Sequence, residues 1–150
     1  MAVGDFISRE KSNDLFKSTL SKGNVFLGEF SGVEHKKFFI VVGLSNDKIY
    51  LCSVFINSSI PTFIYNKQEL LNLQVPIKRA KYNFLKYDSF VSCNTQLKYD
   101  FTDIKKWIDR GICQYIGNID NDDLNNITST LIESGLLTQK EIDLYFSPAN

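Results

Sequence analysis

Few side chains in this sequence could do acid–base chemistry near neutral pH. The single histidine, His35, is followed directly by Lys36 and Lys37. Histidine is the side chain that ordinarily changes charge near neutral pH, and lysine ammonium groups bind phosphate oxygens. The triplet therefore predicts a general base beside a phosphate-binding pair. An ordinary solvent-exposed polar loop is the alternative interpretation.

Other catalytic groupings find little support. The sequence contains no GxxxxGK[ST], GxGxxG, HExxH or GxSxG motif. Cys52 stands inside an apolar segment, so we do not expect it to act as a nucleophile. Asp122 and Asp123 stand at the start of an expected helix, where carboxylates favourably meet the helix dipole. We therefore expect neither a metal nor a cofactor.

Positive charge is concentrated in the middle of the chain. Residues 78–110 hold eight Lys or Arg against four Asp, whereas residues 111–150 hold Lys140 alone against six acidic residues. One interpretation is a basic surface that meets phosphates. The other is a pair of solvated faces that attract each other.

The segment KRAKYNFLK, residues 78–86, interleaves four cations with two aromatic residues. This pattern predicts that Lys78, Arg79 and Lys81 contact phosphates, and that Tyr82 or Phe84 stacks on an unpaired base. Lysines on an edge strand also prevent aggregation between sheets, and that alternative stays open.

These residues must be positioned by a chain of 150 residues, 43% of them apolar, which predicts one globular domain over 1–150. A leading helix is expected within 1–22, with apolar residues at helical spacing in 10–22. C-terminal helices are expected within 118–146, and Thr138 with Glu141 predicts a capping box for the last of them. Between them the hydrophobic patterns predict strands at 24–30, 38–43, 49–56, 75–85, 87–93 and 112–117, and a helical turn at 67–73. A polar turn is expected at 45–48, and a helix at 102–110 with Thr102 as its N-cap. Clustered strands with segregated helices predict an α+β fold with a small antiparallel barrel or a strongly bent sheet.

The charge balance, the longest uncharged segment and the cysteines predict where in the cell the protein is found. The 17 basic residues balance the 17 acidic ones, and the longest nearly uncharged run, 49–66, contains turn residues. We expect no membrane span and no signal peptide. The three cysteines are widely spaced and predict neither a disulfide framework nor a zinc site. Together these features predict a cytoplasmic protein.

Three segments resemble the PemK/MazF-like toxins of type II toxin–antitoxin systems. They are GNVFLGEF–SGVEHKK–FFIVVG near the start, DSFVSCNTQLKYD in the middle and DDLNNITSTLIESGLL near the end. The resemblance covers about half of the chain, mostly residues 23–56 and 88–137. It implies a small SH3-like antiparallel β-barrel with flanking helices and a homodimer. It also implies single-stranded RNA as substrate, cleaved without a metal, and a cognate antitoxin protein as partner.

In that family the ribose 2′-hydroxyl attacks the adjacent phosphate, helped by an acid–base residue and an arginine. Carried onto this chain, the resemblance implies catalytic roles for His35, Asn94 and Lys98. It implies contacts with RNA for Lys36, Lys37 and Thr95, beside the Lys78, Arg79 and Lys81 of the basic segment.

The chain departs from the family pattern at several of these positions. Cys93-Asn94-Thr95-Gln96 replaces Cys-Asp-Gln, Lys37 replaces an arginine, and Ser92 stands where some members have an arginine. An amide cannot take a proton as a carboxylate can, and lysine is a poorer bidentate phosphate ligand than arginine. Two functions therefore stay open: a toxin-like endoribonuclease, and an inactive SH3-like module that binds protein or nucleic acid. A structural accessory protein is a third.

Overall fold

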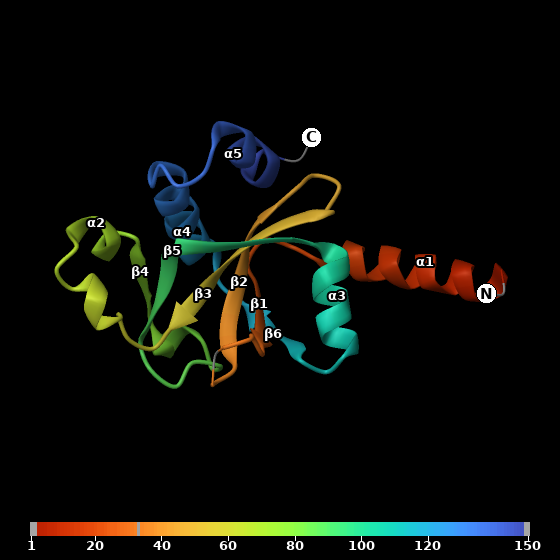
Figure 1. The fold of residues 1–150 in the computed structure, drawn as a ribbon, viewed down its shortest axis with the longest axis horizontal. Coiled ribbons are helices and arrows are strands. Elements are labelled where there is room, and N and C mark those ends of the chain that lie inside the picture. The colour runs from red at the N-terminus through yellow and green to blue at the C-terminus, as the bar shows by residue number, and fades with distance from the viewer. Residues whose placement is uncertain (1–2, 33, 149–150) are drawn as a thin grey trace.

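A computed structural model describes residues 3–32 and 34–148. It is an α+β fold with one six-stranded antiparallel sheet and five α-helices (Figure 1). The strands are β1 (Asn24–Gly28), β2 (Lys37–Leu44), β3 (Tyr50–Asn57), β4 (Gln74–Ile77), β5 (Ser89–Asp100) and β6 (Cys113–Asn118). The helices are α1 (Val3–Thr19), α2 (Gln68–Leu71), α3 (Phe101–Asp109), α4 (Asn121–Glu133) and α5 (Gln139–Phe146), with 3-10 turns η1 (Thr62–Ile64) and η2 (Arg79–Lys81).

The sheet is open, which corrects the expectation of a closed barrel. Its strand order is β4-β5-β3-β2-β1-β6, and no pairing joins β4 to β6 within the described residues. β4 is only four residues long and contains the exposed Pro76. Because proline has no backbone N–H, β4 is poorly suited to pair with a further strand and close the sheet.

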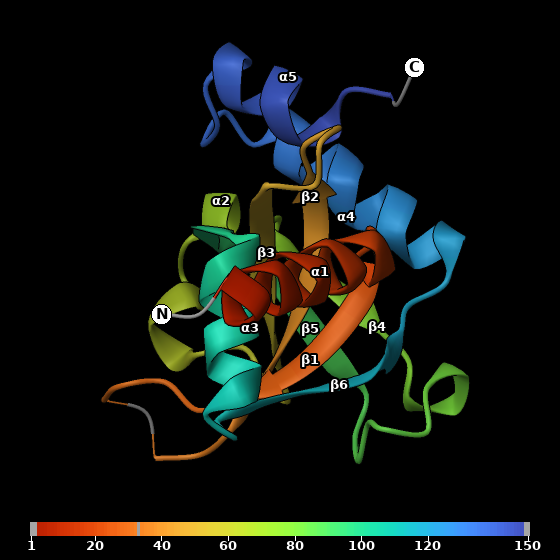
Figure 2. The ribbon, with the colours of Figure 1, turned by 90° about the vertical axis from the view of Figure 1, so that its right-hand side faces the viewer.

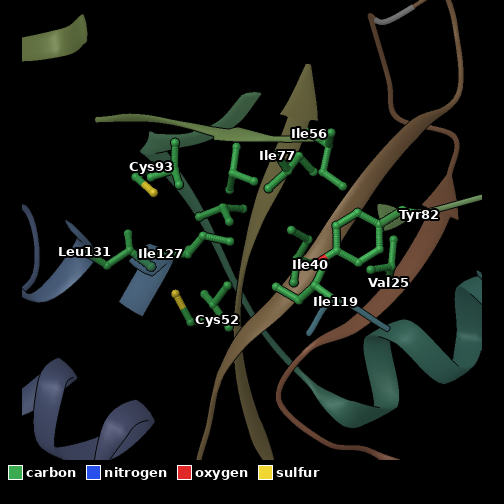
Figure 3. Packing of buried hydrophobic residues seen from close by; sticks show 14 of the residues in the cluster. Val25, Ile40, Cys52, Ile56, Ile77, Tyr82, Cys93, Ile119, Ile127 and Leu131 are labelled. Atoms are coloured by element: carbon green, nitrogen blue, oxygen red, sulfur yellow. The ribbon is translucent and has the colours of Figure 1, made fainter. Parts of the chain in front are cut away.

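Both faces of the sheet are covered. One face packs with α4 and α5, and the other packs with α1 and α3 (Figures 1 and 2). Side chains alternate along β2, where Ile40 belongs to the first core and Phe39 and Val41 belong to the second. The first core, shown in Figure 3, also contains Ile127 and Leu131 of α4. This two-sided burial explains the nearly continuous apolar runs of the strands.

β5 is longer than expected and carries a bulge. Opposite the adjacent β3 residues Val54 and Phe55 stand Gln96 and Ser92, so residues 93–95 have no partner in that ladder. The sequence Asn94-Thr95 looked like the end of a strand, but it is an irregularity within one.

The helix boundaries follow capping chemistry. α1 begins at Val3, before the predicted periodic segment, and the first two residues of the expected leading helix lie outside the described residues. α3 is capped by Asp100 and not by the expected Thr102, because β5 continues up to Asp100. The predicted capping box of α5, Thr138 with Glu141, is confirmed.

Within the described residues, no helix is long and apolar enough to span a bilayer. Cys52, Cys93 and Cys113 are buried as free thiols.

Candidate functional site

A cleft of about 490 Å³ lies where β2 begins, β3 ends and the loop before β5 passes. The β2–β3 ladder aligns Phe38 with Ile56, so the His35–Lys37 segment and Asn57 reach the same end of the sheet. Four basic residues line the cleft, and no carboxylate lines it within the described part of the chain. They are His35, Lys36, Lys37 and Lys86.

Lys37 is held in place by neutral partners. Its Nζ donates a hydrogen bond to Asn57 Oδ1 at 2.8 Å and lies 5.3 Å from the centroid of the Phe55 ring. An amide oxygen and an aromatic face position an ammonium group without cancelling its charge. Lys37 is therefore a positive charge held at the end of β2 that lines the cleft, with its ammonium group over Phe55.

The other cations of the cleft are more exposed. Lys36 Nζ lies 3.8 Å from Glu29 Oε1, and both side chains are more than half exposed, so solvent and salt screen this pair. His35 and Lys86 are exposed in loops. The structure therefore places His35 beside both lysines that the sequence grouped with it.

Aromatic side chains form the apolar part of the cleft. The rings of Phe38 and Phe84 pack with their centroids 5.4 Å apart. Tyr87 is 65% exposed and also lines the cleft. An exposed aromatic ring together with cations is the arrangement on which single-stranded nucleic acids stack their bases.

Asn94 lies at the β5 bulge and serves the packing of β4. Its Oδ1 accepts a hydrogen bond from Gln74 Nε2 at 2.9 Å and another from the Ser92 hydroxyl. Gln96 Nε2 donates to the Cys93 carbonyl at 2.6 Å, which closes the bulge. Thr95 is exposed at its tip. None of these residues lines the cleft.

Lys98 lies farther still from His35. It pairs in the ladder with Cys52, and its Nζ forms an ion pair with Glu141 of α5. Cys52 is five residues from Asn57, the cleft end of β3, which is roughly 16 Å at ~3.3 Å per residue. The structure therefore does not bring Lys98 together with His35.

The basic segment 78–86 is a turn and a loop, not the expected strand. Lys81 Nζ forms ion pairs with Asp120 and, at 3.0 Å, with Asp123, and these carboxylates raise its pKa. Lys78 Nζ lies 3.9 Å from Asp88. Within the described part of the chain, Arg79 and Lys86 are the two cations of this segment that form no ion pair. Lys86 lines the cleft.

Tyr82 is 6% exposed, so the expected stacking on a base has no surface there. Its hydroxyl donates to Asp123 Oδ2 and accepts the backbone N–H of Asp120 at 3.0 Å. Phe84, the other expected stacking residue, is half-buried in the cleft wall.

Burial raises the pKa of the Cys52 thiol to about 12. A thiol that stays protonated at neutral pH is a weak nucleophile, which agrees with the interpretation of the sequence.

Sequence reasoning missed most of the cleft lining, including two polar residues after β3 and a cation–aromatic pair before β5. Asn57 and Ser58 end an apolar strand, and Lys86 and Tyr87 precede β5. The adjacent cation and aromatic at 86–87 were the available signal, but no local pattern placed them opposite His35.

The chain matches no protein-family model and no curated protein sequence in the comparisons made. The resemblance to PemK/MazF-like toxins therefore rests on the quoted segments alone.

Proposed function

We propose that the protein binds single-stranded RNA in the cleft formed by the beginning of β2, the end of β3 and residues 84–89. The observation that carries the proposal is the composition of the cleft lining, which holds four basic residues together with an exposed tyrosine. Phosphates would contact Lys37 and Lys86, and an unpaired base would stack on Tyr87.

Edge protection does not account for these cations. Lys37 opens β2, which lies inside the sheet between β3 and β1, and Lys86 lies in a loop. Lysines that guard a sheet against aggregation stand on edge strands. The positive charge of the cleft therefore supports a ligand that carries negative charge.

A single strand suits the cleft better than a duplex does. A stacking platform needs bases that are free of pairing, and specific recognition of RNA is directed mainly at unpaired segments. Base stacking on an aromatic side chain contributes about 1–3 kcal/mol per base.

Fluorescence anisotropy with a labelled twelve-nucleotide RNA tests the proposal. We expect the double variant Lys37→Gln/Lys86→Gln to bind at least tenfold more weakly than the parent, with a smaller dependence of affinity on salt. Each lost phosphate contact lowers the logarithmic salt slope by about 0.7. Lys140→Gln, an equal change of an exposed lysine on α5, is the matched control and should bind like the parent. Equal affinities for all three proteins would refute the proposal.

The toxin-like endoribonuclease is the second candidate function. The observation that favours it is His35 at the cleft beside Lys36 and Lys37. In this proposal His35 takes the proton of a ribose 2′-hydroxyl, whose oxygen attacks the adjacent phosphorus. The bond from phosphorus to the 5′-oxygen of the next nucleotide breaks, and that oxygen leaves with a proton from water. Lys37 stabilises charge on the attacked phosphate. An SH3-like arrangement of the strands, a cytoplasmic location and a cognate antitoxin belong to the same proposal.

Cleavage of a labelled single strand in the presence of EDTA tests this candidate. We expect His35→Ala to lose most of the activity while it keeps the parent's RNA affinity. Equal cleavage rates for both proteins would remove His35 from the mechanism. Binding without any cleavage would favour the inactive binding module.

A further inference from the structure

We infer that a second hollow beside the cleft recognises a purine base of the bound RNA. This inference rests on the proposed function. The hollow has a volume of about 490 Å³ and lies between the turn η2, the residues that follow it and β6. Phe84 lines both the cleft and the hollow, so the two adjoin. A strand that leaves the cleft past Phe84 enters the hollow.

Phe84 is a firm boundary between the two sites. Its ring packs between Phe38, at 5.4 Å between centroids, and Tyr82, at 5.5 Å. On the β6 side a Cβ on Gly117 would lie 3.7 Å from the Phe84 ring, so the ring rests against a glycine of the sheet. These contacts hold Phe84 as a wall between the cleft and the hollow.

The groups that line the hollow suit a base edge more than a phosphate. Lys81 also lines it, but that ammonium is neutralised by Asp120 and Asp123. Among the described residues that line the hollow, Arg79 is the cation that forms no ion pair, so its N–H groups can donate to a ligand. The exposed side chain of Asn83 also lines the hollow. The charge around the hollow is therefore close to balanced, while its hydrogen-bonding capacity is high.

Arg79 is anchored through its backbone. Its N–H donates to Asp88 Oδ1 at 2.9 Å, which fixes the turn and leaves the guanidinium outside that contact. Arg79 and Asn83 also line a further hollow, whose lining includes Asp88 itself. A carboxylate there repels RNA, so the hollow toward β6 is the better path.

The chemistry of the two side chains predicts a purine. Arginine donates two parallel hydrogen bonds to O6 and N7 of guanine, and asparagine pairs with N6 and N7 of adenine. Pyrimidines have no N7, so they lack this Hoogsteen edge and cannot form either of these two pairings. Single-stranded RNA presents these edges freely.

Three labelled hexanucleotides of equal length and charge test the inference: U6, (UG)3 and (UA)3. We expect the parent to bind the purine-containing RNAs about tenfold more tightly than U6, the effect of one good bidentate contact. Arg79→Gln should lose most of this preference and bind U6 like the parent. Asn83→Ala should reduce the preference for (UA)3. Circular dichroism and melting of each variant confirm its fold.

The control variant is Lys86→Gln, which should weaken all three RNAs by the same factor and keep the preference. Equal binding of all three RNAs by the parent would refute the inference and leave the proposed function standing. An Arg79→Gln variant that weakens every RNA equally would also refute it, because Arg79 would then contact phosphate. No binding of any RNA would overturn the proposed function together with the inference.

Discussion

At the scale of residues, the neighbours of each lysine decide its role. Lys37 is held by an amide and an aromatic ring, so it keeps a charge that a ligand can meet. Lys81 and Lys98 are held by carboxylates and join distant parts of the chain. A sequence shows the type of a side chain but not what the fold brings next to it, which explains why these three lysines looked alike.

Tyr82 should be important for stability and not for RNA. We expect Tyr82→Phe to lower the free energy of unfolding by about 1–3 kcal/mol, because the buried Asp123 carboxylate and the Asp120 N–H each lose a hydrogen-bond partner. Urea unfolding measures the change. Tyr87→Phe is the matched control, since that ring is 65% exposed, and should unfold like the parent. Equal losses in the two variants would contradict this role.

Two ion pairs should make the fold sensitive to acid. The hydrogen bond from Lys81 lowers the pKa of Asp120, and the hydrogen bond from Lys98 lowers the pKa of Glu141. Because these folded-state pKa values lie below the unfolded ones, the ionised carboxylates stabilise the fold above the unfolded values. Their contribution disappears as pH falls from about 5 through the lowered values. We expect stability to fall over this range.

Urea unfolding at pH 7, 4 and 3 measures this loss. The double variant Lys81→Gln/Lys98→Gln should be less stable at pH 7 and should lose less on acidification. The control is Lys78→Gln, whose exposed partner Asp88 lies 3.9 Å away. A double variant that loses stability as steeply as the parent would show that these pairs are not responsible.

At the scale of elements, α5 packs closely against β2 because Gly43 has no side chain. A Cβ at this position in β2 would lie 2.6 Å from Tyr145 Cβ and 3.1 Å from Cys52 Cβ. We therefore expect Gly43→Ala to cost about 1–3 kcal/mol of unfolding free energy by overpacking. Thermal melting measures the loss. Gly117→Ala is the control, because its added Cβ meets the nearest ring at 3.7 Å, and should cost less.

Local sequence signals located most elements and failed where partners are distant. The capping box at Thr138, the polar turn between β2 and β3 and the short strand β6 depend on neighbouring residues and were predicted. The bulge at 93–95 depends on pairing with β3, forty residues away, so the segment looked like a strand end. The cap of α3 moved to Asp100 for the same reason.

At the scale of the whole molecule, the basic middle and the acidic end of the chain attract each other in part. Lys81 and Lys98 meet carboxylates of α4 and α5 or their caps. The cations that line the cleft come from residues far apart in sequence, 35–37 and 86, which the fold brings together. Sequence reasoning found His35, Lys36 and Lys37, but no pattern could reveal the opposite wall. Closure of the sheet also depends on strands that are far apart in the sequence, and the prediction of a closed barrel was wrong.

Association of two copies stays a prediction. Phe63 and Tyr65, at the turn η1, are 64% and 56% exposed, which is much aromatic surface for one short segment. We expect light scattering at micromolar concentration to give twice the 17.2 kDa mass of the chain. The variant Phe63→Ser/Tyr65→Ser should shift the particle toward the single-chain mass. A parent protein of 17.2 kDa would contradict the dimer.

The central claim is that RNA occupies the cleft at the His35 end of the sheet. The most direct test is a titration of ¹⁵N-labelled protein with a single-stranded dodecamer, followed by NMR amide shifts. The account predicts shifts at Lys36, Lys37, Ser58, Lys86 and Tyr87, which line the cleft, and unchanged amides in α2 and α5. Shifts confined to residues 94–98 of β5, or no shifts at all, would contradict it.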